Sequence, residues 1–230
     1  MKKVGLVGGI GPASTLDYYR GIIEGYRART GGNNYPFILI DSLNLTEMYD
    51  LVDSKQWQPF TTKLVDSINS LAAGGAEFAA MAANTAHIVF DEVRRQSPLP
   101  VLSIVEETCK RAKAQDCHRV IVFGTAFTMS SNLYTAAFAK YGIEAFVPTE
   151  AEQQAIHGII FPHLQEGIVL PEEKQTMLAI AQRMIADHQS DGLILGCTEL
   201  PLIIQPGDLN VPLLNTTQIH IDAIVAHLLA

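Results

Sequence analysis

Short apolar runs alternate along the chain with longer stretches whose apolar positions recur every three or four residues. The runs predict strands at 4–8, 37–40, 78–82, 101–104, 120–123, 145–147, 193–196 and 211–214. The longer stretches predict helices at 15–27, 60–73, 88–95, 106–114, 132–141, 152–165, 172–188 and 218–228. Strands separated by helix-length stretches are typical of βαβ units, so we expect parallel sheets whose faces are covered by helices.

The pattern occurs twice. The segment Met81-Ala82-Ala83-Asn84-Thr85-Ala86-His87 matches Leu195-Gly196-Cys197-Thr198-Glu199-Leu200, and Lys3-Val4-Gly5-Leu6-Val7-Gly8-Gly9 matches Arg119-Val120-Ile121-Val122-Phe123-Gly124-Thr125. Ala83 then lies opposite Cys197 and Val4 opposite Val120, with almost the same spacing. Two unrelated coincidences would not share one spacing, so the chain is predicted to have two similar halves.

We therefore expect an α/β protein of two similar Rossmann-like (flavodoxin-like) domains, each with a mainly parallel sheet. The first domain is expected to comprise residues 1–97 and 207–230, and the second residues 98–206, with prolines at 98 and 100 at the first crossing. Ligands of open α/β sheets bind outside the carboxyl ends of the strands, where the four matching turns lie. The sequence thus predicts an active site in the cleft between the two domains.

Composition narrows the classes of partner. The chain has 230 residues and a formal net charge of -8, with no cluster of Lys and Arg, which argues against a nucleic-acid surface. No apolar run approaches the ~18 residues of a membrane span, and the N-terminus has no signal-peptide organisation. We expect a cytoplasmic protein that binds a small molecule and neither nucleic acid nor membrane.

Three cysteines lack the spacing of a zinc site or a CxxC pair, so no metal site is expected. Cys197 follows an apolar run and precedes a predicted helix start, where unpaired N–H groups would stabilise a thiolate that acts as base or nucleophile. The alternative is a buried cysteine that fills core space. Cys109 and Cys117 are expected to be such filler.

Polar residues occupy the matching turns. Asn84 and Thr85, with free backbone amides at a helix start, make a neutral cradle for a carboxylate, although ordinary helix capping remains open. Thr198 has the same setting in the second half. Thr125 and Thr128 follow the matching strand, where they either donate hydroxyl hydrogen bonds to the ligand or cap the next helix.

Two nearby features have weaker functional interpretations. His87 lies in the first turn of a helix without a second histidine at metal spacing, so we expect a hydrogen-bonded core residue. The run Gly8-Gly9-Ile10-Gly11-Pro12 does not fit the dinucleotide pattern GxGxxG, because Ser14 stands where the last glycine belongs. Gly9 is retained as a backbone contact for a small substrate, and no nicotinamide cofactor is expected.

Taken together, these motifs resemble the aspartate/glutamate racemase family, which works without pyridoxal phosphate. The resemblance rests on Val4-Gly5-Leu6-Val7-Gly8-Gly9-Ile10-Gly11, Asn84-Thr85-Ala86-His87, Gly124-Thr125 with Thr128, and Gly196-Cys197-Thr198-Glu199. It implies an isomerase without cofactor, two similar α/β domains, a homodimer, and an amino acid held between two cysteines. Glu199 after the cysteine is similar to the aspartate-directed branch.

The sequence departs from this family at one catalytic position. Ala83 stands where relatives carry their first cysteine, and a methyl group neither accepts nor delivers a proton. Met48 and Gln165 occupy positions where archaeal aspartate racemases have a cationic contact for the substrate side chain. The second face of the substrate and the identity of the amino acid therefore stay open.

We expect a cofactor-independent amino-acid racemase in which Cys197 transfers the α-proton and Ala83 replaces the base of the other face. The substrate-binding residues would be Gly9, Asn84, Thr85, Thr125, Thr128 and Thr198. Two alternatives remain. One is a single-cysteine lyase or decarboxylase of the same superfamily, and the other is a catalytically impaired, even engineered, variant or a carboxylate-binding protein.

Overall fold

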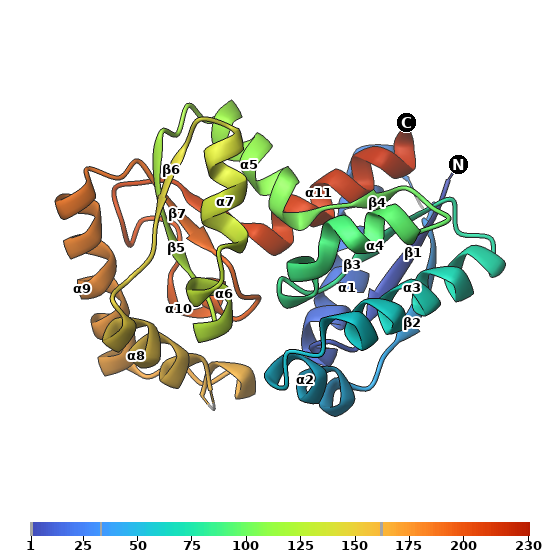
Figure 1. The fold of residues 1–230 in the computed structure, drawn as a ribbon. Coiled ribbons are helices and arrows are strands. Elements are labelled where there is room, and N and C mark those ends of the chain that lie inside the picture. Colours follow the sequence, from blue (N-terminus) through green and yellow to red (C-terminus); the bar gives the residue numbers. More distant parts are fainter. Residues whose placement is uncertain (1, 33, 162) are drawn as a thin grey trace. The chain divides into compact units, whose positions relative to one another are not determined.

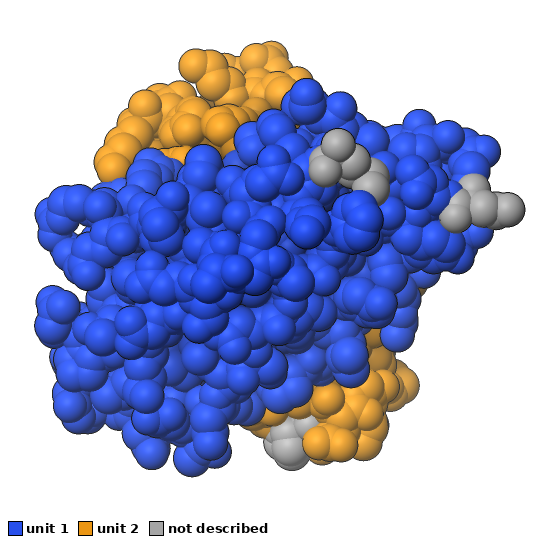
Figure 2. Space-filling view, turned by 90° about the vertical axis from the view of Figure 1, so that its right-hand side faces the viewer, with its two compact units in different colours: residues 1–104, 220–230 blue, residues 105–219 orange. Residues whose placement is uncertain are grey.

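A computed structural model describes residues 2–32, 34–161 and 163–230. The chain forms two compact units, residues 1–104 with 220–230 and residues 105–219, which are coloured separately in Figure 2. It passes from the first unit to the second at the start of one helix and returns within the last helix. Both labelled ends of the chain therefore belong to the first unit (Figure 1).

The first unit is built on a parallel sheet with the strand order β2-β1-β3-β4 among the described residues. Its central strands are buried because helices cover both faces, which explains their almost continuous apolar sequences. The strands are β1 (Lys3–Gly8), β2 (Phe37–Ser42), β3 (Phe78–Met81) and β4 (Val101–Leu102). The helices are α1 (Pro12–Thr30), α2 (Leu45–Asp53), α3 (Trp57–Ala73), the 3-10 helix η1 (Thr85–Val89) and α4 (Phe90–Gln96).

The second unit repeats this design with the strand order β6-β5-β7-β8, again parallel. Its strands are β5 (Arg119–Phe123), β6 (Glu144–Phe146), β7 (Gly192–Leu195) and β8 (Leu213–Asn215). Its helices are α6 (Ala126–Ser130), α7 (Leu133–Lys140), α8 (Glu150–Ile160), η2 (Leu164–Glu166), α9 (Pro171–His188) and α10 (Leu200–Ile203). The helices α5 (Ile104–Ala114) and α11 (Thr216–Leu229) cross the boundary between the units.

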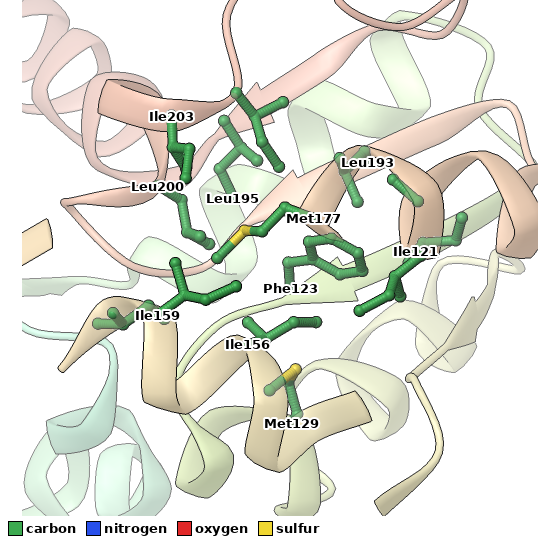
Figure 3. Packing of buried hydrophobic residues seen from close by; sticks show 14 of the residues in the cluster. Ile121, Phe123, Met129, Ile156, Ile159, Met177, Leu193, Leu195, Leu200 and Ile203 are labelled. Carbon is green, nitrogen blue, oxygen red and sulfur yellow. The ribbon is translucent and has the colours of Figure 1, made fainter. Parts of the chain in front are cut away.

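One face of the second sheet packs on an apolar cluster that fixes the ends of β5 and β7. Figure 3 shows the ring of Phe123 among Ile156 of α8 and Met177 of α9, and all three side chains have no exposed surface. Leu200 and Ile203 of the short α10 are buried in the same cluster. Burial of these side chains holds the turn between β7 and α10 against the sheet.

The predicted duplication is confirmed by the strand order and by the register. Val4 of β1 pairs with Ile38 and Phe78, and Val120 of β5 pairs with Ala145 and Gly192. Each half therefore has its first strand between its second and third strands. The fold is the expected pair of α/β units with parallel sheets.

The boundaries between the halves differ from the sequence prediction of 1–97 with 207–230 and of 98–206. Residues 101–104 were assigned to the second domain and 211–214 to the first, but β4 pairs with β3 and β8 pairs with β7. The crossings lie after residue 104 and after residue 219. Strand pairing decides the placement, because a short parallel strand is stable only on the sheet that offers it an open edge.

Most helices begin and end near their predicted positions, but one ends earlier and the short helices α2, α6 and α10 are additional. The expected helix at 152–165 ends at Ile160 and is followed by η2, and residue 162 lies outside the described residues. Helix α2 is additional, and Asn44 caps it by accepting hydrogen bonds from the amides of Thr46 and Glu47 at 3.0 and 3.3 Å. Among the described residues, every helix is too short or too polar to cross a bilayer.

Candidate functional site

Each sheet has a carboxyl edge at which the strand order reverses. The first strand of each half is flanked by the second and the third, and ligands of open α/β sheets generally bind outside the carboxyl ends of the strands at such a reversal. In the first unit, this edge carries the turns after β1 and β3. In the second unit, it carries the turns after β5 and β7. The four motifs selected from the sequence lie at these positions.

One backbone hydrogen bond in each half extends the strand ladder into the turn. The amide of Ala82 donates to the carbonyl of Val7 over 2.9 Å, and the amide of Gly196 donates to the carbonyl of Phe123 over 2.7 Å. A Cβ at position 196 would approach the Phe123 oxygen to 2.8 Å, so this close contact needs glycine. The residues after Ala82 and Gly196 are thereby held at the edge of their sheets.

In the first unit, the turn after β3 presents Ala83, Asn84 and Thr85, which are partly exposed. The side chain of His87 is buried, with 2% exposure, and its Nδ1 lies 2.9 Å from the Ala83 carbonyl. The 3-10 helix η1 begins at Thr85 and leads into α4. The turn therefore has two polar side chains at the edge and a buried imidazole behind them.

In the second unit, the turn after β7 brings a thiol next to a carboxylate. Cys197, Thr198 and Glu199 are partly exposed. The Cys197 Sγ donates to Glu199 Oε2 over 2.8 Å, and the Thr198 hydroxyl donates to the same oxygen over 2.7 Å. A carboxylate that accepts both hydrogen bonds is placed to take the proton from the thiol.

The electrostatic surroundings keep this thiol protonated. Burial raises the pKa of Cys197 well above its usual value, and the charge of Glu199 and the hydrogen bond to it act in the same direction. The backbone amides of Thr198 and Glu199 lower this pKa and are outweighed. The amides at this turn therefore act on the thiol in the expected direction, but α10 spans only Leu200–Ile203, and burial and the carboxylate beside the sulfur outweigh them.

The two threonines after β5 have different settings. Thr125 is partly exposed, whereas Thr128 is buried with 2% exposure. Their hydroxyl oxygens lie 3.1 Å apart, and Thr125 accepts a hydrogen bond from the Thr128 amide at 3.3 Å as the cap of α6. Thr125 is the hydroxyl available at the edge, and Thr128 holds it in place.

Gly9 has a structural role that its sequence position did not reveal. Its φ is +83°, and a Cβ there would meet the Leu43 carbonyl oxygen at 2.1 Å. Its amide donates to the Thr15 hydroxyl over 2.9 Å in a buried setting. Gly9 therefore allows the turn after β1 to pass against the residue that follows β2, and its N–H group is already engaged.

The remaining residues singled out in the sequence lie as follows. Met48 is buried with 1% exposure in α2, and Gln165 is exposed in η2. Cys109 and Cys117 are buried free thiols, and burial raises the pKa of Cys109 to about 12, so both act as core residues. Among the described residues, no group of three His, Cys, Asp or Glu side chains has the arrangement of a metal site.

Two hydrogen bonds at these turns were not predicted from the sequence. Glu199 was noted only as part of a motif, yet it is the hydrogen-bond acceptor of the thiol. Ser14, with 5% exposure, donates to the Ala82 carbonyl over 2.9 Å and so ties α1 to the turn after β3. Ser14 stands where the dinucleotide motif has its last glycine, and this small polar side chain was the sequence feature that could have predicted the contact.

The geometry defines a class of protein in which one α/β unit is present twice and polar turns lie at each reversal of strand order. Comparisons with known proteins agree with this class. The family model Asp/Glu/Hydantoin racemase matches residues 7–224. A broad specificity amino-acid racemase, RacX, from Bacillus subtilis (strain 168) is 26% identical over 221 residues, which cover 93% of this chain and 92% of that protein.

Two solved structures are similar over their full lengths. One, described as that of a candidate Asp/Glu racemase from Yersinia pestis, has a TM-score of 0.95 at 31% identity, with 100% of each chain covered. Another, an aspartate racemase homologue from Pyrococcus horikoshii OT3, has a TM-score of 0.91 at 32% identity with the same coverage. The chain belongs to the Asp/Glu/Hydantoin racemase family.

The close approach at Gly9 generates a stability prediction. Gly9→Ala should lower the free energy of unfolding by about 3 kcal/mol or more, because the methyl group would overlap the Leu43 carbonyl in addition to the strain of a positive φ. Gly31→Ala is the matched control in the same unit, since its φ is +64° and no atom lies within 4 Å of the added Cβ. It should cost only about 1 kcal/mol. Equal losses in urea unfolding of the two variants would contradict the steric account.

The Cys197–Glu199 contact generates a prediction about reactivity. Glu199→Gln removes a negative charge beside the sulfur, so the pKa of Cys197 should fall. The alkylation rate with iodoacetamide at neutral pH should then rise, about tenfold for each unit of pKa. Peptide mapping of Cys109 and Cys117 in the same digest gives the internal control. An unchanged rate at Cys197 would show that Glu199 does not govern the thiol.

Proposed function

We propose that the protein is a cofactor-independent amino-acid racemase in which Cys197 transfers the α-proton and Glu199 exchanges a proton with the thiol. The observation that supports this most is the 2.8 Å contact from Cys197 Sγ to Glu199 Oε2, at the turn after β7, in a chain of a racemase family. A thiol paired with a carboxylate supplies both an acid and a latent base at one position.

The proposed proton path begins from a neutral thiol and an ionised Glu199. Glu199 takes the proton from Cys197, and the thiolate removes the α-proton of the bound amino acid, which regenerates the thiol. The electron pair of the broken C–H bond passes into the substrate carboxylate and forms an enediolate. Return of the proton from Cys197 gives retention, and Glu199 then gives its own proton back to the thiolate. Inversion needs a proton from water at the opposite face, and Glu199 then releases its proton to solvent.

The α-proton is weakly acidic, so the carboxylate needs hydrogen-bond donors that stabilise the developing charge. We propose that Asn84, Thr85, Thr125 and Thr198 supply them to one amino acid. All four are partly exposed polar residues at the carboxyl edges of their sheets. Thr128 and Gly9 are assigned supporting roles, because Thr128 contacts the Thr125 hydroxyl and the Gly9 amide donates to Thr15.

The proposed substrate range extends beyond dicarboxylic amino acids. Met48 and Gln165 are uncharged, and the first of them is buried. The similar protein from Bacillus subtilis (strain 168) is named a broad specificity amino-acid racemase. A panel of Asp, Glu and neutral amino acids, followed by chiral chromatography, measures this range.

We also propose that the protein is a homodimer. On the first unit, β2 is an edge strand of its sheet, and large apolar side chains of β2 and α1 are exposed. They are Leu16, Tyr19, Phe37 and Ile40, with exposures of 63, 45, 56 and 42%. An exposed apolar edge strand pairs readily with a second copy. Light scattering after size exclusion should give twice the 25.1 kDa of the chain, and a monomeric mass at micromolar concentration would contradict the proposal.

Position 83 gives the sharpest test of the racemase proposal. Ala83 is partly exposed and aligns with Cys197 in the duplicated turn. Ala83→Cys should raise the rate of inversion by tenfold or more, because a second thiol supplies proton transfer on the other face. Ala83→Ser is the matched control, since a hydroxyl has similar size but is a far weaker acid. Equal inversion rates for the two variants would contradict the proposed chemistry.

The methyl group of Ala83 also favours one alternative. A lyase or decarboxylase with a single cysteine needs proton delivery to only one face, so the missing thiol would not impair it. Carbon dioxide release from substituted malonates would favour this function. A carboxylate-binding protein without turnover would bind amino acids equally well after Cys197→Ala, and no α-proton exchange would be observed.

A further inference from the structure

His87 connects the turn after β3 with the start of α5. It lies in η1, four residues after Ala83, and its side chain is 2% exposed. The Nδ1 atom lies 2.9 Å from the Ala83 carbonyl oxygen, and the Nε2 atom lies 3.2 Å from the amide nitrogen of Ile104. Ile104 is the last residue of the first unit before the chain enters the second.

These two contacts define the protonation of the ring. A backbone amide can only donate, so Nε2 accepts from Ile104 and carries no hydrogen. The hydrogen of the neutral ring is then on Nδ1, which donates to the Ala83 carbonyl. A doubly protonated ring would lose the contact with Ile104, so the neutral Nδ1–H tautomer is the one that fits both partners.

Aromatic neighbours hold the plane of the ring. His87 stacks on Phe90 with centroids 5.2 Å apart, and the edge of His220 lies 6.1 Å away. His220 is fully buried. Its Nδ1 is hydrogen-bonded to the Tyr18 hydroxyl at 2.9 Å, and its Nε2 to the Leu102 carbonyl oxygen at 3.2 Å. Burial and the proximity of His87 lower the pKa of His220 to about 3, so the His220 ring stays neutral. The hydrogen bonds of His220 therefore connect α1, β4 and α11 of the same unit.

The backbone of His87 adds a second constraint. Its amide donates to the Asn84 carbonyl over 2.9 Å, while its ring donates to the Ala83 carbonyl. The C=O and N–H of a trans peptide point in opposite directions. Since both carbonyls are turned toward His87, the N–H groups of Asn84 and Thr85 point away from it. The side chain at position 83 is oriented by the same peptide.

We infer that His87 is a positioning residue of the site, whose Nδ1–H fixes the Ala83–Asn84 peptide so that the adjoining amides face the substrate carboxylate. The inference rests on the proposed function for its kinetic readout. The two ring nitrogens have separate tasks: Nδ1 holds the substrate-binding turn, and Nε2 holds the start of α5. Two substitutions therefore separate the tasks.

His87→Asn keeps a side-chain amide donor near the position of Nδ1 and loses the acceptor for Ile104. His87→Gln places an amide oxygen near the position of Nε2 and loses the donor to Ala83. Both remove the ring and its stacking on Phe90, so they are matched in lost packing. With the amino acids that exchange their α-proton, His87→Gln should raise KM about tenfold relative to His87→Asn, which corresponds to about 1.4 kcal/mol. Equal KM values for the two variants would overturn the inference.

Two readouts do not depend on turnover. Nitrogen NMR of the wild-type protein should show His87 as the neutral Nδ1–H tautomer near neutral pH, and the Nε2–H tautomer would overturn the inference. Amide hydrogen exchange at Asn84 and Thr85 should be faster in His87→Gln than in His87→Asn, and equal exchange would also overturn it. Both measurements test the role of His87 even if the protein does not racemise amino acids.

Discussion

The backbone hydrogen bonds that prolong β3 and β7 past their last strand residues determine where the chemistry is placed. The contacts Ala82 to Val7 and Gly196 to Phe123 bind each turn to the neighbouring strand at the reversal of strand order. Without these contacts, the residues after them would form flexible loops rather than groups held at a sheet edge. The apolar cluster around Phe123 supports the second contact, because it anchors α10 immediately after the turn.

The duplicated design has diverged in its chemistry. In the second unit the turn carries a thiol, a hydroxyl and a carboxylate in mutual contact, whereas in the first it carries a methyl group, an amide and a hydroxyl. Burial and the carboxylate raise the pKa of Cys197, so in the proposed mechanism its thiol becomes a base only after proton transfer to Glu199. In the first unit, the buried His87 contacts the Ala83 carbonyl of the turn, which is the basis of the positioning role inferred for it.

Much of the fold follows from the sequence, because buried parallel strands are continuous apolar runs and the eight runs agree with β1 to β8. The halves were visible from matching turns. The boundaries between the halves could not be predicted, since the pairing of β4 and β8 is decided by distant strands rather than by local composition.

The site residues Asn84, Thr85, Thr125 and Thr198 were chosen by their place after strands, and their roles remain proposals. The bond from Cys197 to Glu199 depends on side-chain rotamers, and the contact of His87 with Ile104 depends on tertiary packing. Neither of these two contacts can be predicted from the spacing of residues along the sequence.

Exchange of the α-proton in D2O tests the central claim most directly, because it reports proton transfer at Cys197 without requiring inversion. Each enantiomer of each amino acid is incubated with the wild-type protein and with Cys197→Ala, and deuterium incorporation is followed by NMR. The account predicts that one enantiomer exchanges with retention much faster than its mirror image, and that Cys197→Ala abolishes this exchange. Exchange that survives the loss of Cys197, or no exchange with any amino acid, would contradict the account.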